Sequence, residues 1–386
     1  MAAGSAGSSE SRKLYWLALL LTPGLGPARS RQLAERLGGV ENVFHASLTE
    51  LEGAGLAAAA AQAISAGKSI AAAEEEMVRA TSLGAEIIAL DEAAYPSQLK
   101  EIYDPPVLLY VRGALDLLSQ PGIAMVGTRH PTPYGLGMAE RLAGDLAVRG
   151  LVIISGMARG VDTASHRGCL AVQGKTVAVF GTGMDVIYPR ENQKLAEQIL
   201  AQGGAWVTEF AVGTFAAPQN FPIRNRIISG LAIGVLVVEA GEYSGTRITS
   251  RCALEQNRDV FAVPGNVTNK QSWTPNTLIK QGAKLTATWE DVWEELPAAV
   301  RARLAPAAEE SGKPPAAPTL FDGEGLAPHE KKIFALLKAD EATHIDELVE
   351  RLDGVISSSE IFAALFELEL AGRIRQLPGK NYVRVF

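Results

Sequence analysis

The stretch "NFPIRNRIISG", residues 220–230, combines a helix start with two closely spaced cations. Asn220 is a helix-cap residue type, and Pro222 suits a first helical turn. Arg224 and Arg226 then fall in that turn, where the helix N-terminus already carries partial positive charge. Two cations are unfavourable there unless an anion binds beside them. The stretch therefore predicts an anion site, for a cofactor, a substrate or a polymer.

Other segments place glycine, serine or arginine directly after a short apolar run. Parallel strands end at one edge of a sheet, and open α/β sheets bind their ligands at the carboxyl ends of the strands. Backbone N–H groups of such loops, next to helix N-termini, hold phosphates. The five loops span residues 126–135, 155–168, 181–192, 208–226 and 239–253. The arginines that would add cations to this rim are Arg129, Arg159, Arg190, Arg224 and Arg226.

Some of these side chains also have structural interpretations that the sequence leaves open. Arg226 is either a ligand for the anion or a core arginine paired with Glu209 or Glu239. Asp162 and His166 are four residues apart, on one face of a helix. With no second carboxylate beside them, we interpret them as a hydrogen-bonded pair that holds the loop, in preference to a catalytic pair.

Phe221 precedes the two cations and offers an aromatic face. If its loop lies at the sheet edge, the ring is exposed beside arginines, where it can stack on a nucleobase. The alternative is a hydrophobic staple onto the helix that it precedes. The sequence does not separate these two interpretations.

Residue patterns for metal or catalytic chemistry are sparse. Cys169 and Cys252 lie far apart with no CxxC pair, which excludes a cysteine zinc cluster and fits a reducing compartment. The sequence offers no clustered metal ligands and no Ser-His-Asp spacing. We therefore expect no metal, no cofactor and no catalytic turnover.

Charge is unevenly distributed along the chain. The net charge is −7, yet residues 122–283 hold 15 Lys and Arg against 11 Asp and Glu, a balance of +4 that leaves −11 for the remainder. A locally basic region within an acidic chain favours a bound polyanion.

Residues 12–28 have the basic start and short apolar run of a signal peptide. We interpret them as an amphipathic first helix that runs into a glycine turn. No apolar run approaches the roughly 20 residues of a membrane span, so no membrane association is expected.

The 386 residues are enough for two or three domains, at roughly 100–200 residues each. Short, near-continuous apolar runs alternate with helical sequence in the central region, which is typical of a parallel sheet covered on both faces. Before it, Gly-x-Gly turns between helices fit either a helix-hairpin-helix module or a plain helical bundle. The predicted parts are a disordered tail (1–11), a helical module (12–84), a doubly wound, Rossmann-like α/β domain (85–296), a linker (297–325) and a winged-helix domain (326–386).

The winged-helix prediction comes from three helical patterns followed by two β-like runs. The helices are expected at 329–338, 345–352 and 357–371, and the β-like runs surround Pro378 and Gly379. The third helix is acidic and apolar, so it offers DNA phosphates no cation before Arg373. Protein contact or a structural role is therefore favoured over DNA reading for this domain.

The central motifs resemble those of the DNA-processing protein A family (DprA, also called Smf). The matching stretches lie within 122–283 and read "VGTRHPTPYG", "SGMARGVDTASHRGCL", "GKTVAVFGTGMDVIYPREN", "FPIRNRIISGLA", "VVEAGEYSGTRITSRCALEQNRDVFAVPGN" and "NTLIKQGA". The resemblance implies a cytoplasmic single-stranded-DNA-binding protein that dimerises. It also implies protection of incoming strands and loading of the RecA recombinase during natural transformation, with no known catalytic activity.

The resemblance and the glycine loops together identify candidate site residues. The predicted DNA-binding residues are Gly127, Thr128, Arg129, Ser155, Gly156, Arg159, Arg190, Phe221, Arg224, Asn225, Arg226, Ser244, Gly245 and Thr249. Asp162, His166 and Glu239 are expected to support the site structurally. One departure is visible: the family's Ser-x-Gly-x-Asn is "SWTPN" here, and Thr274 and Pro275 put the local geometry of that loop in question.

Two rival functions remain at this level. Related Rossmann-like proteins hydrolyse nucleotides, and Glu239 could serve as a carboxylate catalyst, although the Pro-Gly-Gly-x-Gly-Thr-x-x-Glu signature of those enzymes is absent. The chain could also be a purely structural scaffold for partners. Single-stranded DNA binding is the favoured hypothesis.

Overall fold

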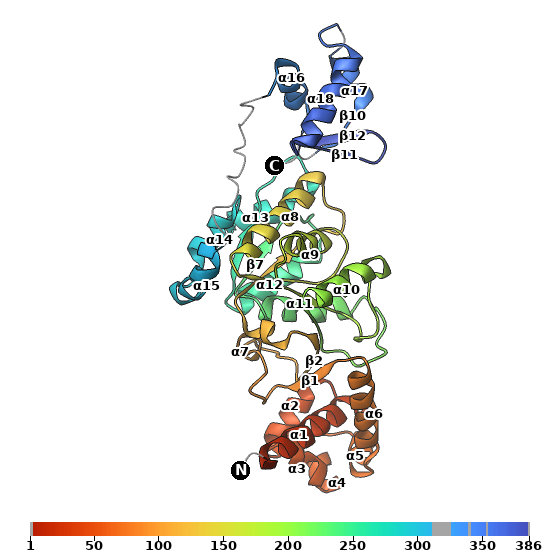
Figure 1. Cartoon of the computed structure of the whole chain (residues 1–386). Helices are drawn as coiled ribbons and strands as arrows, with labels where there is room; N and C mark the ends of the chain where they lie inside the picture. Colours follow the sequence, from red (N-terminus) through yellow and green to blue (C-terminus); the bar gives the residue numbers. More distant parts are fainter. Residues whose placement is uncertain (1–2, 311–325, 339–340, 353, 385–386) are drawn as a thin grey trace.

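The computed structural model describes residues 3–310, 326–338, 341–352 and 354–384. Figure 1 shows three parts in a row: N-terminal helices at one end, a sheet covered by helices in the middle, and a small helix-and-hairpin unit at the other end. Within these ranges, no helix combines the length and the apolar character needed to cross a membrane.

The N-terminal part consists of six helices. They are α1 (Ala3–Leu21), α2 (Pro27–Arg36), α3 (Val40–His45), α4 (Leu48–Gly53), α5 (Ala58–Ser65) and α6 (Lys68–Ser82). The prediction of a disordered tail over 1–11 is wrong from Ala3 onward, because α1 already begins there. Once the apolar turn that follows is anchored, each preceding residue adds one helical hydrogen bond at little cost.

The central sheet has nine strands. They are β1 (Glu86–Ala89), β2 (Leu108–Gly113), β3 (Gly122–Val126), β4 (Val152–Ser155), β5 (Thr176–Val179), β6 (Ala205–Thr208), β7 (Gly234–Val237), β8 (Asp259–Ala262) and β9 (Lys284–Leu285). Their order is β1-β2-β6-β5-β4-β3-β7-β8-β9, and every pair from β6 to β9 is parallel. β2 pairs antiparallel with β6, and β1 pairs antiparallel with β2 at the edge of the sheet.

The stretch β5-β4-β3-β7-β8-β9 has the doubly wound order of a Rossmann fold. The chain winds outward from β3 through β4 and β5 to β6 and then returns to start β7 on the other side of β3. The strand order therefore reverses between β3 and β7. The predicted doubly wound, mostly parallel sheet is confirmed.

Helices cover both faces because successive strand residues point to opposite sides. On one face, α8 (Pro133–Val148), α9 (Val161–Ala171) and α14 (Trp289–Glu295) pack on β3, β4 and β7. The other face of these strands is covered by α11 (Asn220–Gly230), α12 (Thr246–Glu255), α13 (Trp273–Lys280) and the short α7 (Ser97–Lys100). The remaining elements of this part are η1 (Leu115–Ser119), η2 (Arg190–Asn192), α10 (Gln193–Ala201) and η3 (Lys270–Ser272).

The segment predicted as a linker begins with a helix. α15 (Ala298–Glu310) follows α14 directly, and its Val300 and Leu304 pack into the same core as Trp293. Apolar residues at i and i+4 give this Ala-rich stretch a face to bury, and that face is what the composition-based prediction overlooked. The rest of the predicted linker, residues 311–325, lies outside the described residues.

The C-terminal unit has a core of its own. Its elements are α16 (Pro328–Leu336), β10 (Thr343–His344), α17 (Ile345–Arg351), α18 (Ser358–Leu370), β11 (Ile374–Leu377) and β12 (Asn381–Arg384). The three strands pair antiparallel in the order β10-β12-β11. Three helices followed by a hairpin confirm the winged-helix prediction, whereas the exact domain boundaries stay predictions.

The N-terminal helices, by contrast, share a core with the sheet. Leu17, Leu33 and Leu51 belong to the same buried cluster as Trp206 on β6 and Phe180 after β5. One buried carboxylate, Glu76 on α6, adds polar contacts across this junction. It accepts hydrogen bonds from the Tyr110 hydroxyl on β2 (3.0 Å), from the backbone N–H of Val212 (2.6 Å) and from Arg79 (2.5 Å).

Replacement of Glu76 by alanine is expected to lower the free energy of unfolding by about 3 kcal/mol, because the Tyr110 hydroxyl and the Val212 N–H lose their buried acceptor. Urea unfolding of the full chain measures the change. Glu75→Ala is the matched control, since Glu75 is exposed on the same helix and its loss should change stability by no more than about 0.5 kcal/mol. Equal effects of the two variants would contradict the role of Glu76.

Candidate nucleic-acid interface

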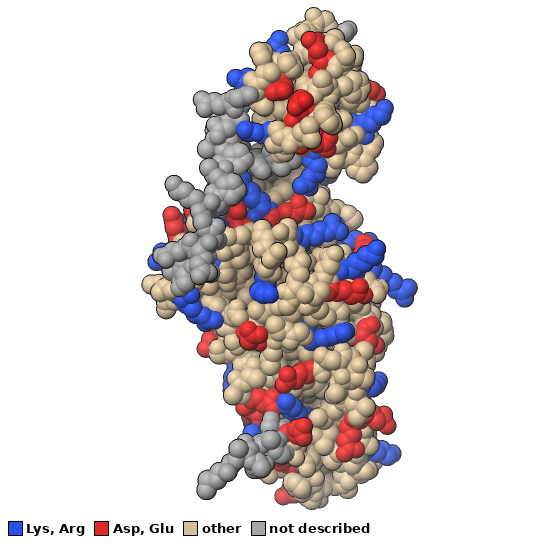
Figure 2. Space-filling view, viewed as in Figure 1, with Lys and Arg blue, Asp and Glu red and all other residues tan. Residues whose placement is uncertain are grey.

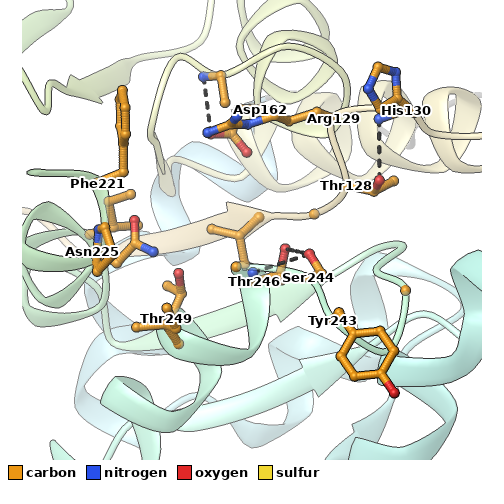
Figure 3. A pocket seen from close by; sticks show the side chains of 18 of the residues that line it. Thr128, Arg129, His130, Asp162, Phe221, Asn225, Tyr243, Ser244, Thr246 and Thr249 are labelled. Carbon is orange, nitrogen blue, oxygen red and sulfur yellow. Dashed lines mark hydrogen bonds between the residues drawn. The ribbon is translucent and has the colours of Figure 1, made fainter. Parts of the chain in front are cut away.

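A pocket of about 1010 Å³ opens where the strand order reverses, at the carboxyl ends of β3 and β7. This is where open α/β sheets bind ligands. Its walls come from the loop after β3, the residues before α9, the start of α11, and the loop after β7 (Figure 3). All five predicted loops contribute lining residues, the 181–192 loop through Tyr188 and the 155–168 loop through Ala158 and Asp162.

The loop after β3 is fixed by close backbone packing. A Cβ on Gly127 would lie 2.5 Å from Val161 and 2.8 Å from the Glu239 carbonyl oxygen, so only glycine fits there. The Thr128 N–H donates to the same carbonyl (2.6 Å), and the Thr128 hydroxyl accepts from the His130 N–H (3.2 Å). Arg129 is thereby presented at the pocket mouth with its side chain exposed.

Arg129 and Phe221 come together as predicted for neighbouring loops. The Arg129 guanidinium carbon lies 5.7 Å from the centroid of the Phe221 ring, and both residues line the pocket. Within the described part of the chain, no carboxylate forms an ion pair with Arg129. Its charge is therefore available to a ligand.

The Phe221 ring is half-buried and rests over Gly181, where an added Cβ would lie 3.0 Å from the ring. Tyr188 packs beside it, with ring centroids 5.6 Å apart. The staple interpretation is wrong, because α11 begins at Asn220 and Phe221 lies inside the helix instead of before it. Asn220 is likewise not the cap; its side-chain amide donates to the Gly181 carbonyl (3.1 Å) and ties α11 to the loop after β5.

Arg224 lines the floor of the pocket and does not lie on its rim. It is 4% exposed, and its Nη1 donates to the carbonyl oxygens of Gly156 (2.6 Å) and Val179. A Cβ on Gly156 would come within 2.5 Å of that nitrogen, so Gly156 serves to admit the guanidinium. Burial lowers the pKa of Arg224 to about 10. The predicted direct phosphate contact is therefore corrected: Arg224 positions the ends of β4 and β5 and the start of α11.

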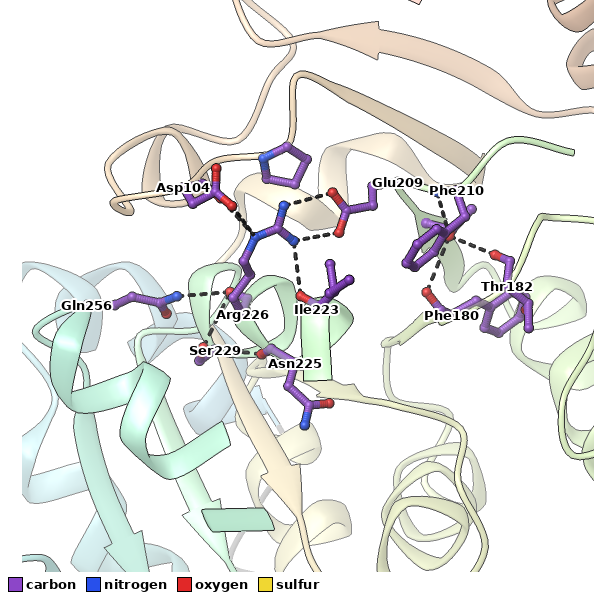
Figure 4. Close-up of polar contacts among 12 residues, drawn as sticks. Asp104, Phe180, Thr182, Glu209, Phe210, Ile223, Asn225, Arg226, Ser229 and Gln256 are labelled. Carbon is purple, nitrogen blue, oxygen red and sulfur yellow. Dashed lines mark hydrogen bonds and ion pairs between the residues drawn. The ribbon is translucent and has the colours of Figure 1, made fainter. Parts of the chain in front are cut away.

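Arg226 is a core arginine paired with a glutamate, which is the structural alternative that the sequence left open. Two of its nitrogens bond both carboxylate oxygens of Glu209 (2.5 and 2.7 Å), and its Nε donates to the Asp104 carbonyl (2.9 Å), as Figure 4 shows. The side chain is largely buried and does not line the pocket. The prediction of Arg226 as a DNA ligand is corrected, because its charge is already neutralised by Glu209. Asn225, between the two arginines, does face the pocket (Figure 3).

The loop after β4 contributes less to the pocket than predicted. Ser155 is fully buried and its hydroxyl donates to the Met125 carbonyl (2.6 Å), so it is corrected to a structural residue. Arg159 is exposed, but its Nε and Nη2 donate to the two carboxylate oxygens of Glu191, and the distance from Nη2 to Oε2 is 2.8 Å. Arg190 is exposed, and the described residues provide it with no ion-pair partner.

Asp162 and His166 support the loop separately, so the predicted hydrogen bond between them is wrong. Asp162 accepts the Ala158 N–H (3.2 Å), and burial raises its pKa while Arg224 acts in the opposite direction. His166 Nδ1 instead contacts the Thr176 hydroxyl (2.7 Å). Because Thr176 donates its own proton to the Ile153 carbonyl (2.6 Å), we assign the ring proton to Nδ1.

The loop after β7 is held by hydroxyl and carboxylate contacts. Ser244 bonds the Thr246 hydroxyl (2.9 Å), and Thr249 is buried against the pocket wall. Gly245 is exposed, with open space where a Cβ would stand, so it leaves backbone at the pocket accessible. Glu239 accepts both the N–H (2.8 Å) and the hydroxyl (2.7 Å) of Thr132, at the start of α8.

Several pocket residues were not predicted. Tyr243 is 91% exposed, Trp273 is 39% exposed, and Lys270 lies beside them. The sequence signal for Tyr243 is an aromatic residue within the short polar stretch "GEYSGT". Trp273 lies in the "SWTPN" motif, which differs from the family's Ser-x-Gly-x-Asn. The hydroxyl of Thr274 in this motif donates to the Gly241 carbonyl (2.8 Å) and so fixes the loop after β7.

Comparison with known proteins agrees with this geometry. The doubly wound sheet, with a pocket where its strand order reverses, defines a Rossmann-like protein. Residues 86–297 match the family model "DNA recombination-mediator protein A", and residues 312–380 match "DprA winged helix domain". The chain therefore belongs to the DNA-processing protein A family (DprA/Smf).

Individual relatives support the same assignment. The chain is 42% identical to Protein Smf of Escherichia coli over 78% of this chain and 77% of that protein. It is 33% identical to Protein Smf of Synechocystis over 97% of this chain and all of that protein. The crystal structure of DNA processing protein A from Streptococcus pneumoniae superposes with a TM-score of 0.65 at 35% identity, covering 74% of this chain and 98% of that one.

His166 gives the site a measurable pH signature. Burial lowers its pKa to about 3, whereas the unfolded residue titrates near 6.5. Between these values the unfolded chain binds a proton that the folded chain does not. The contribution of His166 to stability is therefore complete above pH 6.5 and declines as the pH falls. From pH 7 to pH 5 the free energy of unfolding should drop by about 2 kcal/mol from this residue.

Urea unfolding at pH 7, 6 and 5 measures this decline in the wild type and in His166→Gln. The glutamine variant can still bond Thr176 but cannot take up the proton, so its decline should be smaller by about 2 kcal/mol. His130→Gln, which removes an exposed histidine at the same pocket, should follow the wild type. Parallel pH profiles for wild type and His166→Gln would contradict the assignment.

Proposed function

We propose that this chain binds single-stranded DNA in the pocket between β3 and β7. The observation that carries the proposal is the pairing of Arg129, an arginine without an ion-pair partner among the described residues, with the face of Phe221. A cation for phosphate and an aromatic face for a base are the two groups that proteins use to bind single strands without sequence preference.

The surrounding side chains favour a single strand over a duplex. Tyr188, Tyr243 and Trp273 add aromatic surface along the pocket walls. Bases offer their faces to such rings only when they are unstacked, as in a single strand. On the face shown in Figure 2, basic and acidic side chains intermingle over all three parts. This face therefore has no general basic coat, and DNA binding would depend on the pocket.

Family membership supports a proposal for the cellular role. We propose that the protein acts in the cytoplasm as a homodimer that protects incoming single strands and loads the RecA recombinase during natural transformation. The relative from Streptococcus pneumoniae is named a DNA processing protein, which supports the DNA-processing part of this role. Candidate DNA contacts are Arg129, Arg190, Phe221 and Asn225, with Gly127, Thr128, Ser244, Gly245 and Thr249 shaping the pocket.

The nucleotide-hydrolase alternative receives less support. Both carboxylate oxygens of Glu239 already accept hydrogen bonds from Thr132, and Glu239 is not among the residues that line the pocket. Asp162 lines the pocket but is buried and accepts the Ala158 N–H. Within the described ranges, no three metal-ligating side chains gather. We therefore propose a binding protein without catalytic turnover.

Titration of a labelled 20-mer oligonucleotide against a mononucleotide tests the proposal directly. We expect tighter binding of the 20-mer, with a log–log salt slope that grows by about 0.7 for each phosphate contacted. Tighter binding of the mononucleotide, or affinity that does not change with salt, would refute single-strand binding. Base or phosphate release that disappears in Glu239→Gln would support the hydrolase instead.

Two substitutions in the pocket should differ in their salt dependence. Arg129→Ala should weaken 20-mer binding by about 1.5–3 kcal/mol, the range for charge-assisted hydrogen bonds, and should lower the salt slope by about 0.7. Phe221→Ala should cost about 1–3 kcal/mol of stacking and leave the slope nearly unchanged. Fluorescence anisotropy at several salt concentrations measures both quantities.

Two further variants serve as controls for this pair. Arg351→Ala removes an exposed, salt-bridged arginine of α17 and should leave DNA affinity unchanged. Arg224→Ala should act mainly on folding, because it leaves two carbonyl oxygens and Asp162 without their buried cation. Equal salt slopes for Arg129→Ala and wild type would exclude Arg129 from phosphate binding.

A further inference from the structure

The winged-helix unit carries an apolar stripe that its fold does not use. Phe362, Phe366 and Leu370 of α18 are 52%, 61% and 69% exposed. They are spaced four residues apart and therefore form one stripe along the helix. The core-facing side of α18 is a different set, Ile361, Ala364, Leu365 and Leu368, which is fully buried. One buried stripe is enough to pack a surface helix, so the second stripe calls for a partner.

Glutamates border this stripe. At 100° per residue, Glu369 lies on one side of it, and Glu367 and Glu360 lie on the other. The helix from Ser358 to Leu370 contains three glutamates and no lysine or arginine. A negative border repels phosphates, so a nucleic acid is a poor occupant of the surface that a winged-helix protein would normally present to DNA.

A second copy of the chain is also a poor occupant. In a two-fold contact the same surface meets itself, so the stripe of one α18 would face the stripe of the other. Their glutamate borders would then lie against each other, and like charges in contact destabilise such a pair.

The helix is also held rigidly enough to act as a preformed surface. The Ser357 hydroxyl accepts the Glu360 N–H while Glu360 accepts the Ser357 N–H (2.9 Å), which closes a capping box at the start. Near the end, Glu369 accepts the backbone N–H of Gln376 on β11 (3.1 Å). A surface ordered before binding loses little conformational entropy when a partner docks.

We propose that Phe362, Phe366 and Leu370 form a docking surface for an amphipathic helix of another protein, one whose apolar stripe is bordered by lysine and arginine. Two helices can pack their apolar stripes together, as in helix-in-groove recognition. Phenylalanine is enriched in the buried centres of protein interfaces, and the basic border of the partner would complement the three glutamates. This surface is separate from the pocket between β3 and β7 and does not depend on single-strand binding.

The test uses the full chain and two designed peptides of about 20 residues, long enough to form a helix. Both peptides carry the same leucine stripe, which is bordered by lysine and arginine in one and by glutamate in the other. Fluorescence anisotropy should show at least roughly tenfold tighter binding of the basic peptide. Equal affinities would overturn the proposal.

Variants then locate the binding surface. Phe362→Ser with Phe366→Ser should weaken binding of the basic peptide at least about tenfold, as expected when two central anchors are lost. Glu367→Lys should also weaken it, whereas the matched charge change Glu350→Lys, exposed on α17, should not. Thermal unfolding should be unchanged in all variants, because the altered side chains are exposed. Binding that survives the double serine variant would overturn the proposal.

The two rival occupants are tested with the same double variant. If light scattering shows that the double variant converts a dimer to a monomer, a second copy covers the stripe and the proposal is wrong. If instead the variant loses affinity for a duplex oligonucleotide, the stripe serves DNA and the proposal is again wrong. If the double variant keeps the mass and the duplex affinity of the wild type, the result supports docking of a helix from another protein on the stripe.

Discussion

The buried guanidinium of Arg224 is the contact on which the candidate site depends. It bonds the carbonyl oxygens of Gly156 and Val179, and so joins the ends of β4 and β5 to the first turn of α11. Its presence explains why residue 156 is glycine and why Asp162 can be buried beneath the pocket. The same positive charge acts with burial to keep His166 neutral. Removing it would leave two carbonyls and a carboxylate uncompensated, which is costly in a low-dielectric interior.

This arrangement also resolves the charge problem at the start of α11. Two cations at a helix N-terminus need compensation, and the protein supplies it internally: Glu209 pairs with Arg226, while carbonyl oxygens and Asp162 surround Arg224. The cations left for an external anion come from other segments: Arg129 from the loop after β3, Arg190 from η2 and Lys270 from η3 have no ion-pair partner among the described residues. The proposed anion site would therefore take its charge from these segments, while α11 contributes Phe221 and Asn225.

The sequence predicts the order of the elements well and the direction of single side chains poorly. Apolar runs between helices were sufficient for the doubly wound sheet, and the sheet topology brings Gly127, Arg129 and Ser244 to one edge as expected. Ser155 and Arg226 follow the same loop pattern yet point into the protein. Loop side chains turn inward when a buried acceptor is near, and such acceptors, here Met125 and Glu209, come from distant segments. Their positions are fixed only by tertiary packing.

The two flanking parts differ in how they can influence the pocket. The N-terminal helices share a hydrophobic core with β6, and Glu76 holds the backbone of Val212, in the loop that leads to α11. This module therefore contacts the segment that leads to Phe221 directly, through the backbone of Val212. The winged-helix unit has its own core, and the ion pair that joins Arg375 to Glu140 on α8 (3.6 Å) is partly exposed to solvent and therefore weak. A partner bound to α18 would thus act mainly by bringing another protein close to the DNA site, and not by reshaping the pocket.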